Sequence, residues 1–230
     1  MCNPAQPAYS PSKRPVLLYY ITDRTQFAGN ATEQQKNLLE RIAECAHAEV
    51  DYIQLREKDL TTRELEQLAR QAMAAIPAGS STRLLINSRL DVALACGAHG
   101  VHLPANNLSA SEARAIFARA GHAHPIIGVS THSAAEAAAA ESHGADFAVF
   151  GAVFEKSGRT NPGGFEQLAA ATHGAMPVLA LGGVSLQNAE QCLWAGAAGI
   201  AGIRIFQQGE VSATVKMLRR LQAAPTSAGL

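Results

Sequence analysis

One short segment of the chain, YIQLREK, combines apolar side chains with two cations in a pattern that could bind an anion. In an extended strand Gln54, Arg56 and Lys58 share one face, and Ile53 and Leu55 share the other. A strand on the protein surface would show the same alternation. Further apolar strands, each followed by an alanine-rich helical stretch, favour a parallel sheet that is buried on both faces. In that setting the cations would face a shared cavity.

Other polar residues lie at or after the ends of later apolar segments. His102 could belong to a binding site or be a hydrogen-bonded histidine of the core, and both interpretations stay open. His132 could cap a helix, but its position between a strand and a helix favours a functional role. The loop residues Lys156 and Arg159 could simply be solvated. The further candidates are Asn87, Ser130, Glu155 and Arg204.

Two adjacent glycines, Gly182 and Gly183, follow an apolar strand and precede a helix that Ser185 is expected to cap. Glycine lets backbone N–H groups approach an oxyanion closely, and amides around Ile203 and Arg204 could add to the same site. A tight turn explains one glycine better than two. The pair therefore predicts a phosphate-binding loop.

Composition limits the possible functions. The chain has 230 residues, 47% of them hydrophobic, and carries 19 Lys plus Arg against 19 Asp plus Glu. Such a balance provides no overall field that would favour nucleic acid or an anionic membrane. No apolar run reaches the length of a membrane span, and the widely spaced cysteines are typical of a reducing cytoplasm. We therefore expect a cytoplasmic protein with no nucleic-acid or membrane partner.

Eight strand-then-helix units follow one another along the chain, which is the count of a (β/α)8 barrel. A doubly wound sheet is the weaker alternative, because no strand leads into a glycine-rich nucleotide-binding loop. We predict a single α/β TIM barrel over residues 15–222, with flexible tails at 1–14 and 223–230. The expected strands are 16–22, 51–56, 83–87, 100–103, 125–129, 146–150, 177–181 and 199–203.

In such a barrel the active site lies at the C-terminal ends of the strands. All the polar candidates named above would converge there. The motifs that occupy these strand ends are, in order, QLREK from Gln54, Ile-Asn at 86–87, GVHL at 100–103, GVSTHS at 128–133, FGAVF at 150–154 and LGGV at 181–184.

In this order and combination the motifs resemble those of thiamine phosphate synthases, from about residue 17 to 206. In that family the nitrogen of a thiazole phosphate attacks an aminopyrimidine diphosphate, and magnesium and basic groups offset the charge on the departing pyrophosphate. The resemblance implies that Gln54, Arg56 and Lys58 face the diphosphate. It also implies that Gly183 and the amides after the eighth strand hold the thiazole phosphate.

The sequence departs from the synthase pattern on the diphosphate side. Ser88 stands where synthases carry an Asp, and residues 104–107 read Pro-Ala-Asn-Asn where they carry a second magnesium-binding Asp. Magnesium prefers anionic oxygen ligands, and neither segment supplies one. Residues 156–159 read Lys-Ser-Gly-Arg in place of Thr-x-Thr-Lys, and Arg204 replaces a small polar residue.

These losses indicate the sister branch of thiazole tautomerases, which the segment Val-Phe-Glu at 153–155 also resembles. There a carboxythiazole phosphate is isomerised by proton transfer without a metal, so we expect no cofactor, and magnesium only if the chain is a synthase. By resemblance His132 is the acid and base. Two alternatives remain open: a divergent synthase, and a non-catalytic protein that binds thiazole phosphate. The expected partner is a small phosphorylated thiazole, and a homo-oligomer is possible. The predicted substrate-binding residues are Gln54, Arg56, Lys58, Asn87, His102, Ser130, Glu155 and Arg159, and the predicted phosphate-binding residues are Gly182, Gly183, Ile203 and Arg204.

Overall fold

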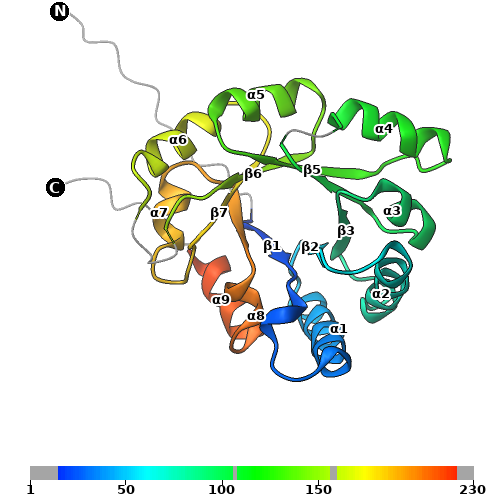
Figure 1. Cartoon of the computed structure of the whole chain (residues 1–230). Coiled ribbons are helices and arrows are strands. Elements are labelled where there is room, and N and C mark those ends of the chain that lie inside the picture. Colours follow the sequence, from blue (N-terminus) through cyan, green and yellow to red (C-terminus); the bar gives the residue numbers. More distant parts are fainter. Residues whose placement is uncertain (1–14, 106–107, 156–159, 222–230) are drawn as a thin grey trace, which may run out of the picture.

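Eight parallel strands alternate with helices and close into a barrel in the computed structural model of the chain (Figure 1). The structure describes residues 15–105, 108–155 and 160–221. Strand order follows chain order, and β1 pairs with both β2 and β8, which closes the sheet. The predicted (β/α)8 fold is confirmed. The strands are β1 (Leu17–Ile21), β2 (Tyr52–Leu55), β3 (Arg83–Asn87), β4 (Gly100–Leu103), β5 (Ile126–Thr131), β6 (Phe147–Gly151), β7 (Val178–Leu181) and β8 (Gly199–Gly202).

Helices surround the barrel, and several begin at a side-chain cap. Asn30, Thr61 and Ser109 each accept a hydrogen bond from the third residue of the following helix, whose Glu side chain bonds back to the cap. No helix in the described part of the chain is long and apolar enough to cross a membrane. The helices are η1 (Arg24–Gln26), α1 (Ala31–His47), α2 (Thr62–Ala75), α3 (Leu90–Cys96), α4 (Ala110–Arg119), α5 (Ala134–Ser142), α6 (Gly164–Ala171), α7 (Ala189–Trp194), α8 (Arg204–Gln207) and α9 (Val211–Arg220).

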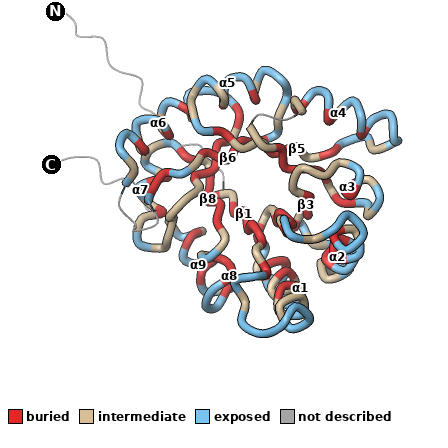
Figure 2. The backbone as a smooth tube through the Cα atoms, viewed as in Figure 1, coloured by how far each residue is buried: buried red, intermediate tan, exposed pale blue. Residues whose placement is uncertain are grey.

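The strands are buried on both faces because their side chains alternate between two cores. Tyr19, Phe147 and Leu179 belong to a small cluster inside the barrel, where Phe147 stacks on Tyr52 at 4.8 Å between ring centroids. The next residues along the strands, such as Leu18 and Ala148, pack outward into the larger core beneath the helices. Figure 2 shows the result: buried strands at the centre and exposed surfaces on the outer sides of the helices.

Most strand ends differ from the sequence prediction by one or two residues, and three differences bear on the site. Strand β5 continues to Thr131, so Ser130 lies within the strand. The short helix α8, which was not predicted, directly follows β8. The predicted cap of α7 is wrong, because the backbone N–H of Ser185 instead donates to Oδ1 of Asn188 at 2.7 Å, and the helix begins only at Ala189. The predicted tails 1–14 and 223–230 lie outside the described residues, and the domain limits stay a prediction.

Candidate active site

Four predicted site residues lie on neighbouring strands near one end of the barrel. Gln54 is the third residue of β2, Asn87 ends β3, His102 is the third residue of β4, and Ser130 is the fifth of β5. In the sheet register Asn87 pairs with His102, and His102 pairs with Gly128. The barrel therefore brings these residues together at the carboxyl ends of its strands, where such folds place their chemistry.

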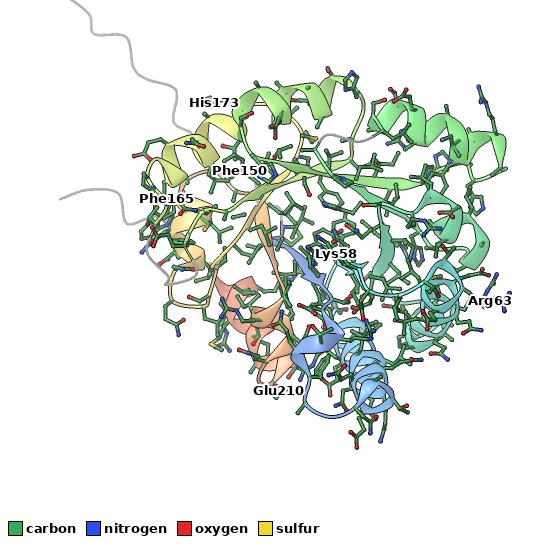
Figure 3. All side chains as sticks on the ribbon, viewed as in Figure 1. Lys58, Arg63, Phe150, Phe165, His173 and Glu210 are labelled. Carbon is green, nitrogen blue, oxygen red and sulfur yellow. The ribbon has the colours of Figure 1, made fainter. Side chains whose placement is uncertain are left out.

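The two cations follow the end of β2 and differ in exposure. Arg56 is half-buried, whereas Lys58 is exposed. Figure 3 shows Lys58 within the ring of strands in projection, while Arg63 and Glu210 lie at the periphery of the molecule. Arg56 lies near enough to His102 for its charge to help lower the pKa of that ring, so it too lies beside the strand ends predicted for the site.

Between these cations Glu57 is turned inward and held by a buried network. Its carboxylate accepts hydrogen bonds from the Thr22 hydroxyl at 2.5 Å and the Arg24 backbone N–H at 3.1 Å, and it pairs with the Arg24 guanidinium at 3.0 Å. Arg24 also bonds Asp59, and the backbone N–H of Arg56 donates to Thr22 Oγ1 at 2.9 Å. Burial raises the pKa of Glu57, and these hydrogen bonds oppose that rise.

This network fixes the path of the loop that follows β2. Because Glu57 is 5% exposed and Arg24 is 8% exposed, the ion pair ties the loop after β1 to the loop after β2 at a depth that solvent does not reach. The residues on either side of Glu57, Arg56 and Lys58, are thereby left to face the barrel mouth. Thr22 and Arg24 were not predicted as site residues, because no local spacing in the sequence links the end of one strand to the loop after the next.

A second buried network crosses the barrel interior. Gln54 Nε2 donates to the Tyr19 hydroxyl at 2.9 Å, which lies 3.2 Å from His102 Nδ1, and His102 Nε2 lies 2.9 Å from Ser130 Oγ. His102 is 3% exposed. Burial, with a smaller contribution from the nearby Arg56 cation, lowers the pKa of His102 to about 3. This ring is therefore neutral at physiological pH, which makes it a hydrogen-bonded core histidine that also reaches the site.

His132 lies outside this second buried network, on the segment after β5. The side chain is exposed, and Nδ1 lies 2.5 Å from the backbone carbonyl of Gly151 at the end of β6. A carbonyl can only accept, so Nδ1 carries the hydrogen, and in the neutral ring Nε2 carries the lone pair that can take a proton. The backbone N–H of His132 donates to the Glu136 carboxylate at 2.6 Å. The position suits an acid or base that faces solvent or ligand.

The glycine pair after β7 adopts the backbone conformation that its residue type permits. Gly182 and Gly183 have φ angles of 94° and 67°, both in the region that favours glycine. A Cβ at Gly183 would lie 2.7 Å from the Phe154 Cβ and 2.8 Å from the Glu155 carbonyl oxygen. The Asn188 side chain donates to the Gly183 carbonyl at 3.1 Å. The loop is thus narrow, and only glycine fits it.

The loops after β6 and β8 complete this part of the site. Phe154 donates its backbone N–H to the Gly182 carbonyl at 3.0 Å, which brings the exposed Glu155 beside the glycine pair. Ile203 is the N-cap of α8 and Arg204 is exposed at its first position. Since β7 and β8 are neighbours in the barrel, these residues lie next to the glycine loop. Lys156 and Arg159 lie outside the described residues.

The residues at the expected magnesium positions do not fit that ion. Ser88 has a φ of 60° and donates its backbone N–H to the His102 carbonyl at 2.9 Å, and it offers a neutral hydroxyl where magnesium prefers an anionic oxygen. Pro104 and Ala105 have no polar side-chain atom, and positions 106–107 lie outside the described residues. In the part of the chain that the structure describes, no three His, Cys, Asp or Glu side chains are grouped to hold a metal ion.

Two surface hollows lie away from these strand ends. One of about 270 Å³ is lined by residues such as His99 and Pro125, at the opposite end of the barrel, and one of about 570 Å³ lies beside His47 and Val211. Neither contains a predicted site residue. We place the site at the carboxyl ends of the strands, because that is where the cations, the polar network and the glycine loop converge.

Known proteins share both the sequence pattern and the fold. A family model described as thiamine monophosphate synthase matches residues 18–206. A relative from Geobacter sulfurreducens, named "Putative thiamine-phosphate synthase", is 44% identical over 188 residues, which cover 80% of this chain and 83% of the relative. The thiamine-phosphate synthase of Methanoculleus marisnigri is 34% identical over 219 residues, covering 92% of this chain and 98% of its own.

A solved structure shows the same similarity in three dimensions. The thiamine phosphate pyrophosphorylase of Pyrococcus furiosus superposes with a TM-score of 0.74 at 29% identity, and the match covers 92% of this chain and 97% of that one. The matched segment of the family model contains every strand end that forms the candidate site. The chain therefore belongs to the thiamine monophosphate synthase family.

Proposed function

We propose that this protein joins a thiazole phosphate to an aminopyrimidine diphosphate, the reaction that its resemblance to thiamine phosphate synthases implies, and so acts in thiamine biosynthesis. The observation that supports this proposal is the family membership over residues 18–206, together with the two cations, Arg56 and Lys58, at the mouth of the barrel. We thus prefer the synthase, which was an alternative, to the tautomerase that the missing magnesium ligands indicated. The relatives reported above carry the names thiamine-phosphate synthase, putative thiamine-phosphate synthase and thiamine phosphate pyrophosphorylase, and none of them is named as an isomerase.

The chemistry assigns each part of the site a task. A lone pair of the thiazole nitrogen attacks the methylene carbon, a C–N bond forms, and the C–O bond to the diphosphate breaks with its electrons leaving on pyrophosphate. Arg56 and Lys58 stabilise the negative charge that grows on the leaving group. Gln54, Asn87 and Ser130 orient the pyrimidine. Gly182, Gly183, Ile203 and Arg204 hold the thiazole phosphate, with Glu155 at its edge.

A specific observation favours a second candidate, the thiazole tautomerase. Ser88 and the side chains at 104 and 105 do not fit a magnesium ion, and a tautomerase needs no metal. In that reaction His132 Nε2 would remove a proton at one ring position and return it at another, since Nδ1 is occupied by the Gly151 carbonyl. Arg56 and Lys58 would then bind the substrate carboxylate.

Turnover of both substrate sets by the purified protein tests the proposal. We expect thiamine phosphate from the thiazole phosphate and the pyrimidine diphosphate. Arg56→Gln should lower that rate about 10²-fold, because a charge-stabilising donor is lost. The control Arg63→Gln, at an exposed position on α2, should leave the rate unchanged. No coupling with or without magnesium, but isomerisation of the carboxythiazole phosphate in EDTA, would select the tautomerase.

His132 provides the test of the second candidate. If it carries the proton, His132→Asn should lower tautomerase turnover about 10²–10⁴-fold and leave affinity for the substrate nearly unchanged. His173→Asn is the matched control, since His173 is also exposed and also bonds a backbone carbonyl through Nδ1, but it lies beyond α6. Tight binding of thiazole phosphate with no turnover in either assay would instead identify a non-catalytic binding protein.

A further inference from the structure

A series of hydrogen-bonded side chains inside the barrel, here called the polar chain, joins four strands. It runs from Gln54 on β2 through Tyr19 on β1 and His102 on β4 to Ser130 on β5. Tyr19, Gln54 and His102 are buried, at 0%, 2% and 3% exposure, so water does not compete for these bonds. Only Ser130, near the end of its strand, is half-buried and reaches the mouth.

Counting the hydrogens along the polar chain shows which group donates and which accepts in each of its hydrogen bonds. The Gln54 amide nitrogen can only donate, so the Tyr19 oxygen accepts there and its single hydrogen is directed to His102 Nδ1. Burial lowers the pKa of His102 to about 3, so the ring is neutral and has one N–H. That hydrogen must then sit on Nε2, which donates it to Ser130 Oγ. The Ser130 hydroxyl hydrogen is then not used by any of these hydrogen bonds and can be donated to another acceptor.

We propose that Tyr19 is a positioning residue that holds His102 as its Nε2–H tautomer and thereby makes Ser130 a hydrogen-bond donor to an acceptor atom of the substrate. The assignment of the tautomer stands on the free protein alone. The role of Ser130 rests on the proposed function, which places substrate over this strand end. Reversal of the Gln54 amide would reverse every bond in the chain, so the two arrangements exclude one another.

Nitrogen-15 NMR of the histidine-labelled protein without substrate tests the tautomer directly. We expect the His102 Nε2 resonance at the position of a protonated nitrogen and the Nδ1 resonance at that of a lone-pair nitrogen, with the assignment made by its loss in His102→Gln. Tyr19→Phe should mix the two tautomers, because Nδ1 loses its donor. A parent protein with the hydrogen on Nδ1 would overturn the proposal, whatever reaction the enzyme catalyses.

A double-mutant cycle tests whether Tyr19 acts through Ser130. Ser130→Ala and Tyr19→Phe should each lower kcat/KM roughly tenfold, the usual effect of one hydrogen bond. The double variant should be no worse than Ser130→Ala alone, because both changes remove the same contact. Tyr20→Phe is the matched control: its hydroxyl is as deeply buried but bonds Gln207 at 3.0 Å on the outer side of β1.

The outcomes of the cycle separate the two proposals. Tyr20→Phe should combine additively with Ser130→Ala, since the two hydroxyls share no partner. Additive losses for Tyr19→Phe and Ser130→Ala would overturn the coupling. A parent enzyme with no turnover of either substrate set would overturn the proposed function, and the NMR measurement would still decide the tautomer.

Discussion

At the residue scale, a buried carboxylate supports the cations of the site. Glu57 lies between Arg56 and Lys58 in the sequence and points the opposite way, into a network with Thr22 and Arg24. An unpaired buried charge is unfavourable, so each charged member of this network stabilises the orientation of the others. The alternation of β2 thus continues for three residues beyond its end at Leu55, with the Glu57 carboxylate buried and the two cations at the barrel mouth.

Loss of this carboxylate should destabilise the protein strongly. We expect Glu57→Ala to lower the free energy of unfolding by ~3 kcal/mol, because it leaves the buried Arg24 with only Asp59 as a partner. The control Glu66→Ala, which removes an exposed pair with Arg70 on α2, should cost under about 1 kcal/mol. Urea unfolding of both variants measures the difference. Equal losses would show that Glu57 contributes no more than a surface ion pair does.

The glycine loop provides a prediction about binding. Gly183→Ala should abolish measurable affinity for thiazole phosphate in calorimetric titration, because the new methyl group would overlap Phe154 and the Glu155 carbonyl. Gly97→Ala is the matched control, since Gly97 has nearly the same φ of 68° but no neighbouring atom within 4 Å of its Cβ position. In both variants the left-handed backbone conformation of the new alanine lowers the stability by roughly 1–2 kcal/mol. Full affinity in a folded Gly183→Ala protein would exclude the loop from phosphate binding.

At the scale of elements, the helix starts show what a local pattern can and cannot decide. Ser109 caps α4 through its hydroxyl, and Glu112 bonds back to it. Ser185 occupies a similar place in the sequence, but the chain makes a further turn held by Asn188 before α7 begins. The difference arises because the turn after the glycine loop, which the Ser185–Asn188 hydrogen bond closes, places the start of the helix at Ala189.

These two serines should therefore differ in their effect on stability. We expect Ser109→Ala to lower the free energy of unfolding by about 1 kcal/mol, as loss of a helix cap does. Ser185→Ala should change it by less than about 0.5 kcal/mol, because its contribution is a backbone N–H that alanine retains. Thermal and urea unfolding provide the comparison. A larger loss at Ser185 would mean that its hydroxyl supports the loop.

At the scale of the whole molecule, closure of the sheet creates an interior in which polar groups are cut off from water. The neutral His102 is one consequence. Below its ordinary pKa of about 6.5 the unfolded chain takes up a proton that the folded chain, with a pKa of about 3, does not. Proton binding to the unfolded state lowers stability as the pH falls, so the loss begins near pH 6.5 and continues toward pH 3.

This linkage can be measured by urea unfolding between about pH 7 and pH 5. We expect the free energy of unfolding to fall more steeply with decreasing pH in the parent than in His102→Gln, by up to about 1.4 kcal/mol per pH unit. The comparison uses slopes, so any constant destabilisation by the substitution cancels. Parallel slopes would mean that His102 takes up its proton equally in both states.

The sequence by itself determined the barrel, because eight apolar strands with alternating helices have few other ways to bury both faces of each strand. The residue type also permits the positive φ angles that Gly182 and Gly183 adopt in the structure. Only the tertiary structure decided what Tyr19 and Glu57 do. The partners of Tyr19 come from other strands and those of Glu57 from the loop after β1, and the folded sheet brings them within hydrogen-bond distance. Contacts between residues distant in the chain leave no periodicity in a single sequence, so this part of the site became visible only in the folded molecule.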